Sequence, residues 1–76
     1  MLLTPSMLQQ LLEERIPESK VAVTDLTGTM DHYKVDIVSP VFEGKSLIEQ
    51  HKVVHQACGE YLTREIHALQ IKTSTP

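Results

Sequence analysis

The spacing of apolar residues switches repeatedly along this 76-residue chain between the period of an α-helix and the alternation of a β-strand. A first helix is predicted to begin at Thr4, a good N-cap residue, with Pro5 at the first helical position and Pro17 as its stop. Its apolar stripe consists of Met7, Leu8, Leu11, Leu12 and Ile16. We therefore expect an amphipathic helix that packs on a core.

Two alternating segments follow, and this pattern is typical of half-buried strands. Their inner faces are marked by Val21, Val23, Tyr33, Val35 and Ile37. Residues 25–31 between them contain Thr-Gly-Thr, which favours a turn, so the two strands should form an antiparallel hairpin. Ser39-Pro40 ends the second strand because proline cannot donate to a ladder.

A capping box formed by Ser46 and Glu49 predicts a second helix, after an exposed connector over residues 42–45. Its predicted apolar stripe consists of Leu47, Ile48, Val54, Ala57 and Cys58. Gly59 ends or kinks this helix, and Tyr61 and Leu62 indicate one short further helical turn. A last strand starts near Ile66. Its alternation puts His67, Leu69, Ile71 and Thr73 on one face.

This order predicts a single α+β domain over residues 1–76, a two-layer sandwich with the helices on one face of a three-stranded mixed sheet. The crossover through the second helix favours parallel pairing of the last strand with one strand of the hairpin.

Charge and cysteine content narrow the function classes. Seven basic and ten acidic residues give a net charge of −3, so nucleic acid is not the default partner, although a local basic patch remains open. The single cysteine excludes an internal disulfide and any CxxC motif, which fits a reducing cytoplasm. No apolar run approaches the roughly 18 residues of a membrane span, and we expect no membrane partner.

Four histidines are the candidate ligands. His51 and His55 are spaced i, i+4 on the second helix and could clamp a metal if a third ligand approached, but solvated or half-packed helix residues are the preferred interpretation. His67 is either a ligand that projects past the end of the sheet or a strand-edge histidine bonded to nearby backbone. The position of His67 in the sequence does not decide between these two interpretations.

No catalytic set is apparent. Cys58 falls on the apolar stripe of the second helix, which predicts a small buried hydrophobe with an inert thiol. Gly44 and Lys45 precede a helix, but the phosphate-loop spacing is absent. Without a nucleophile, a base and a group to orient them, we do not expect an enzyme.

Four short motifs follow one another in a specific order and spacing: Val41-Phe42-Glu43-Gly44-Lys45-Ser46-Leu47, Gln50-His51-Lys52-Val53-Val54, Ile66-His67-Ala68-Leu69 and Lys72-Thr73-Ser74-Thr75-Pro76. Together they resemble the BolA-like family in its BolA/IbaG branch. The resemblance spans residues 21–76 and implies an α-β-β-α-α-β fold similar to class II KH domains.

The resemblance also implies a function. Members of this family pair with monothiol glutaredoxins and share a bridged [2Fe-2S] cluster, in iron–sulfur cluster trafficking and iron regulation. The family's C-terminal histidine maps onto His67, which would ligate the cluster together with the glutaredoxin cysteine and glutathione. A second ligand is expected in the loop between the first two strands. Residues 26–31 contain neither Cys nor His, so His32 is the nearby candidate.

The alternative that the resemblance leaves open is a DNA-binding transcription regulator, which would use Lys45, Lys52 and Arg64. Many members carry Arg-His-Arg where this chain has Gln50-His51-Lys52, so one positive charge is missing here. A Gly-x-x-Gly clamp of KH domains is also absent. Weak homodimer formation remains open as well.

Overall fold

The computed structural model describes residues 3–28, 32–63, 66 and 68–76. Its elements, in chain order, are α1 (Pro5–Arg15), β1 (Lys20–Asp25), β2 (His32–Val38), the 3-10 turn η1 (Pro40–Phe42), α2 (Leu47–Cys58), the 3-10 turn η2 (Gly59–Thr63) and β3 (Ala68–Ser74). The predicted α-β-β-α-α-β order is confirmed, with η2 as its third, short helix.

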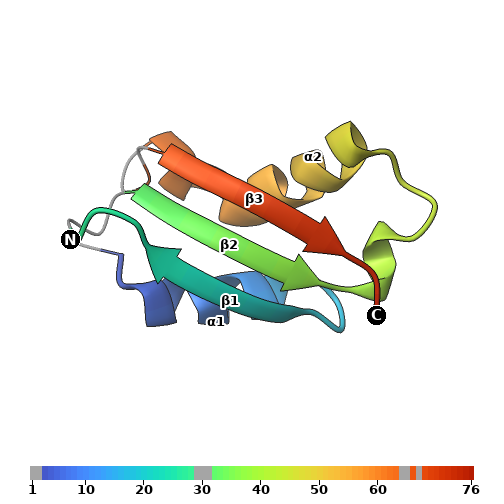
Figure 1. Ribbon diagram of the computed structural model, residues 1–76, viewed down its shortest axis with the longest axis horizontal. Coiled ribbons are helices and arrows are strands. Elements are labelled where there is room, and N and C mark those ends of the chain that lie inside the picture. The colour runs from blue at the N-terminus through green and yellow to red at the C-terminus, as the bar shows by residue number, and fades with distance from the viewer. Residues whose placement is uncertain (1–2, 29–31, 64–65, 67) are drawn as a thin grey trace.

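The three strands form one mixed sheet in the order β1-β2-β3. β1 and β2 are antiparallel, and β2 and β3 are parallel, as the crossover predicted. Both helices lie behind the same face of the sheet (Figure 1). The fold is therefore a two-layer α+β sandwich in which no described element covers the second sheet face (Figure 1). Lys34 and Lys72 are exposed and belong to that open face by strand alternation.

α1 begins as predicted, because the Thr4 hydroxyl accepts a hydrogen bond from the Met7 N–H at 3.1 Å. Leu8 and Leu12 are fully buried, as is Ile16 just beyond the helix. The prediction for Met7 was wrong: its side chain is 40% exposed. Met7 precedes Leu8 by one residue, about 100° around the helix, and so lies at the margin of the buried stripe.

α2 carries the predicted capping box, since Ser46 N–H donates to Glu49 Oε1 at 3.0 Å and Glu49 N–H donates to Ser46 Oγ at 3.2 Å. The bond from the Ser46 N–H lowers the pKa of Glu49. Leu47 and Ile48, however, are 64% and 71% exposed, which corrects their assignment to the core stripe. The fully buried residues of α2 begin at Val54, and Val53 packs against the core as a partly buried residue, so the first turn of the helix lies outside the core.

The connector between β2 and α2 is folded more tightly than predicted. Ser39 is fully buried, and its hydroxyl donates to the Pro17 carbonyl at 2.6 Å and accepts from the Val41 N–H at 3.2 Å. This cap starts η1, which turns Phe42 inward until only 1% of it is exposed. Phe42 is thus a core residue and not part of an exposed connector, whereas Glu43 and Gly44 are exposed as expected.

The central strand supplies the middle of the core. On β2, at most 1% of each of the side chains Tyr33, Val35 and Ile37 is exposed. In contrast, the inward-facing residues of β3, which include Leu69 and Ile71, are only half-buried. The core therefore thins toward the β3 edge of the sheet.

Candidate functional site

His32 is the first residue of β2, and it lies opposite Ala68, the first residue of β3. The Leu26 N–H donates to the His32 carbonyl at 2.8 Å, which extends the β1–β2 ladder by one bond. The Asp25 carboxylate accepts from the N–H groups of Thr27 and Gly28 at 3.3 and 3.0 Å and so orders the start of the hairpin loop. The His32 backbone is thus held by a bond from Leu26, next to the end of β1, and lies in register with Ala68 of β3.

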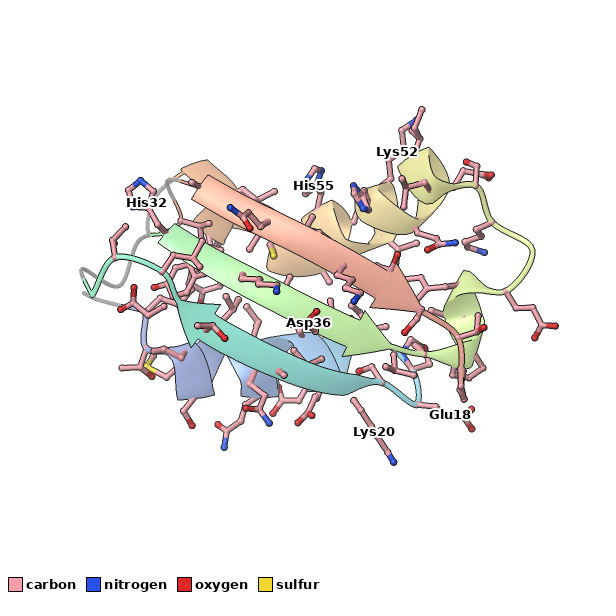
Figure 2. All side chains as sticks on the ribbon, viewed as in Figure 1. Glu18, Lys20, His32, Asp36, Lys52 and His55 are labelled. Atoms are coloured by element: carbon pink, nitrogen blue, oxygen red, sulfur yellow. The ribbon has the colours of Figure 1, made fainter. Side chains whose placement is uncertain are left out.

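The His32 side chain is half-buried and belongs, by strand alternation, to the open face of the sheet with Lys34 and Asp36. Figure 2 shows His32 at one end of the sheet, far from Lys52 and His55 on α2. His67 and Arg64, two residues of the predicted sites, lie outside the described residues. The structure does place Ala68, the residue that follows His67 in the sequence, beside His32.

The described part of the chain contains no group of three His, Cys, Asp or Glu side chains that could hold a metal ion. A [2Fe-2S] cluster takes its ligands from thiolates and, in some proteins, from two histidines. The described residues therefore do not form a complete ligand set for such a cluster.

The His51–His55 pair is on a continuous helix, so its i, i+4 spacing is preserved. His55 is exposed, whereas His51 is half-buried, with a buried Nε2 that has no hydrogen-bond partner among the described residues. Since no third described donor joins them, the chelate that the spacing allowed is not assembled within this part of the chain.

Cys58 is fully buried near the end of α2, which confirms its interpretation as a small core residue. Burial raises the pKa of its thiol to about 11, against the smaller opposing effect of the Arg15 charge. The Arg15 guanidinium donates to the Ala57 carbonyl at 2.9 Å and so joins α1 to the end of α2. A thiol in this state is a poor nucleophile and a poor cluster ligand.

The raised pKa predicts a pH effect on stability. The folded protein favours the neutral thiol, so the contribution of Cys58 is fully present below pH 9, the ordinary pKa of the unfolded group, and is lost as the pH rises towards 11. Relative to Cys58→Ala, the wild type should lose up to about 2 kcal/mol of unfolding free energy over this window. Urea unfolding at several pH values measures the difference, and parallel pH profiles of the two proteins would contradict it.

Two of the three residues of the nucleic-acid alternative are described, Lys45 and Lys52, and the charges of both act on the Glu49 carboxylate, while Arg64 lies outside the described residues. Lys52 is exposed on α2 and Lys45 is half-buried in the preceding loop. On α2, the exposed apolar residues Leu47 and Ile48 come first, and the acidic Glu49 follows them before Lys52. This surface is mixed rather than basic.

Gln50 has a role that the sequence did not reveal. Its Nε2 donates to the Lys45 carbonyl at 2.9 Å and to the Phe42 carbonyl at 3.5 Å, and its Oε1 accepts from the Thr73 hydroxyl. One side chain thus joins the connector, α2 and β3. What looked like a missing positive charge is a structural bridge, and only a three-dimensional arrangement could indicate it.

No helix in the described ranges is both long and apolar enough to cross a membrane.

Comparison with known proteins assigns the family. Residues 7–76 match the family model described as BolA-like protein. The chain is 42% identical over 66 residues to the uncharacterized protein RP812 of Rickettsia prowazekii, covering 87% of this chain and 86% of that protein. It is 43% identical over 49 residues to mouse BolA-like protein 1, covering 64% of this chain but only 36% of that longer protein.

Solved structures agree with this. A BolA protein homologue from Coxiella burnetii superimposes with a TM-score of 0.84 at 31% identity, covering 96% of this chain and 91% of that one. Yeast Fra2 gives a TM-score of 0.84 at 35% identity, covering 99% of this chain and 82% of that one. The sheet order, the short third helix and these matches together place the chain in the BolA-like family.

Proposed function

We propose that this chain is a non-catalytic partner of a monothiol glutaredoxin in the cytoplasm, and that the two proteins share a bridged [2Fe-2S] cluster in iron–sulfur cluster trafficking and iron regulation. His67 is the principal ligand from this chain and His32 the second. The observation that carries the proposal is the parallel register of β2 and β3, which pairs His32 with Ala68.

Neighbouring strands lie about 4.8 Å apart, and consecutive Cα atoms are about 3.8 Å apart. His32 thus lies about one strand spacing from Ala68, the residue that follows His67 in the sequence. His32 belongs to the open face of the sheet and is the first residue of β2, as Ala68 is of β3. The proposed cluster site is therefore at the end of the sheet where both strands begin.

The ligand count supports a shared site. Two imidazoles from this chain leave two positions for thiolates, which the glutaredoxin cysteine and glutathione supply. Replacing thiolate ligands by histidine raises the reduction potential of a cluster and makes it sensitive to protons. Cys58 does not compete for the cluster because it is buried and its pKa is raised.

Mixing the protein with a cluster-loaded monothiol glutaredoxin should change the visible absorption and circular dichroism of the cluster. His67→Ala should abolish this change, since its imidazole is removed from the site, and His32→Ala should alter or weaken it. His55→Ala is the matched control, because His55 is exposed on α2 at a distance from His32 and should leave the change intact (Figure 2).

An identical spectral change with wild type and His67→Ala would overturn the proposal. Binding to cluster-free glutaredoxin, measured by calorimetry, shows whether each variant still recognises its partner. The described surface gives no specific support to the alternative of a DNA-binding regulator. That alternative would reveal itself as duplex binding that weakens steeply with salt and depends on Lys45, Lys52 and Arg64.

A further inference from the structure

The two edges of the sheet differ in how their outward-facing backbone groups are paired. At the outer edge of β1, the Val21 N–H donates to the Glu13 carboxylate of α1 at 3.2 Å. A charged side chain at this position discourages another strand from pairing there. β3 forms the opposite edge, as Figure 1 shows, and among the described residues no strand lies beyond it.

The hydrogen-bond pattern shows which groups of β3 face outward. The Ser39 N–H donates to the Ser74 carbonyl at 3.0 Å, so the peptide groups of Ser74 face β2. Peptide groups alternate in direction along a strand, so those of Lys72 and Gln70 also face β2. The N–H and C=O groups of Leu69, Ile71 and Thr73 therefore face away from the sheet, and none of the backbone bonds between described residues uses them.

The side chains at this edge are also incompletely covered. Leu69 and Ile71 pack against the core but are only half-buried, whereas every inward-facing residue from Tyr33 to Ile37 on β2 is buried. An added strand would bury the exposed remainder of the two side chains and satisfy the outward peptide groups.

We infer that β3 is a self-association edge, on which β3 of a second copy pairs antiparallel, centred on Ile71. In this register Ile71 faces Ile71 of the second copy, and Leu69 faces its Thr73. Each of these pairs consists of residues whose peptide groups face outward, so each can exchange hydrogen bonds in the narrow antiparallel pattern.

The sequence of β3 is self-complementary in this register. On the open face, Lys72 lies opposite Gln70 of the second copy, and no like charges meet. The contact is isologous, with the same edge used by both copies, so a two-fold axis closes it. The resulting six-stranded sheet ends on both sides at β1, where Glu13 blocks further growth, and the assembly therefore stops at a dimer.

Gln70 provides the test, because it is exposed and makes no contribution to the core. Gln70→Lys places lysines opposite Lys72 at two symmetric positions and should weaken the dimer roughly three- to tenfold, while Gln70→Glu creates two opposite-charge pairs and should strengthen it by a similar factor. Sedimentation equilibrium of the protein alone, from about 10 µM to about 1 mM, measures these constants.

The matched controls are Thr24→Lys and Thr24→Glu. Thr24 is exposed and flanks Lys34 on the opposite side from Gln70, so these variants put the same charges on the same face, away from β3. They should leave the association constant unchanged. In wild type, the amide signals of Leu69, Ile71 and Thr73 should shift with concentration and those of Gln70 and Lys72 much less.

A chain that stays monomeric to about 1 mM would overturn the inference. So would a dimer that responds equally to the Gln70 and Thr24 variants, since it would use another face. No glutaredoxin is present in these measurements, so their failure leaves the proposed cluster function untouched.

Discussion

Phe42→Ala is expected to lower the free energy of unfolding by about 3–5 kcal/mol. Only 1% of Phe42 is exposed, and its ring is part of the hydrophobic core together with residues of α1, β2 and α2. Removing the ring takes away buried apolar area and leaves a cavity that the short η1 turn cannot close by itself. A domain of this size has few kcal/mol to lose, so a large unfolded population should be visible at 37 °C.

Urea unfolding followed by circular dichroism measures the Phe42 effect. Leu47→Ala is the matched control, since Leu47 is a large apolar residue five positions later that is 64% exposed. We expect this control to stay within about 0.5 kcal/mol of wild type. A loss below 1 kcal/mol for Phe42→Ala would show that the ring is not packed as described.

Ser39→Ala is expected to cost about 1.5–3 kcal/mol, although it removes a single oxygen atom. The Ser39 hydroxyl is the donor to the Pro17 carbonyl and the acceptor for the Val41 N–H, and the residue has no exposed surface. With alanine at this position, the Pro17 carbonyl loses its donor and the Val41 N–H loses its acceptor. The substitution should therefore loosen the join between the end of α1 and the start of η1.

The Ser39 effect can be separated from a general loss of stability. Hydrogen exchange of the Val41 amide should accelerate more than that of Val35 in the centre of the sheet. Ser6→Ala, at an exposed position of α1, is the control and should change little. Equal unfolding free energies of wild type and Ser39→Ala would contradict the assignment of the hydroxyl as a buried bridge.

Most of the fold could be predicted from the sequence because its signals are local. Thr4-Pro5 and the Ser46–Glu49 pair specify helix starts through bonds within one turn, and the alternation at Tyr33, Val35 and Ile37 specifies the inner face of β2. The parallel pairing of β3 followed from the length and type of the connection.

The failures at Met7, Phe42, Leu47 and Ile48 share a physical origin. Apolar character does not tell whether a residue meets the sheet, because that depends on where each helix crosses it. The first turn of α2 lies outside the core, so Leu47 and Ile48 stay exposed, while a buried cap at Ser39 turns Phe42 inward. Both effects depend on contacts between elements that are distant in the sequence, and a short stretch of sequence does not contain that information.

The same limit applies to the candidate site. The sequence predicted His32 and His67 by type and resemblance, but only the strand register shows that His32 pairs with the residue after His67. The role of Gln50 depends on Phe42, Lys45 and Thr73, three positions spread over more than thirty residues of the chain. No pattern within α2 could have indicated it.

The parallel register also has a consequence for the order of folding. Each residue of β2 pairs with the one 36 positions later, from His32–Ala68 to Val38–Ser74. The hairpin can close early through a short loop, but the other edge of β2 must wait for a distant segment, and forming that contact costs loop-closure entropy. During synthesis, the most buried strand of the protein would thus have one edge unpaired until β3 leaves the ribosome. A nascent chain stalled before Ala68 should expose Val35 and Ile37 to chaperones.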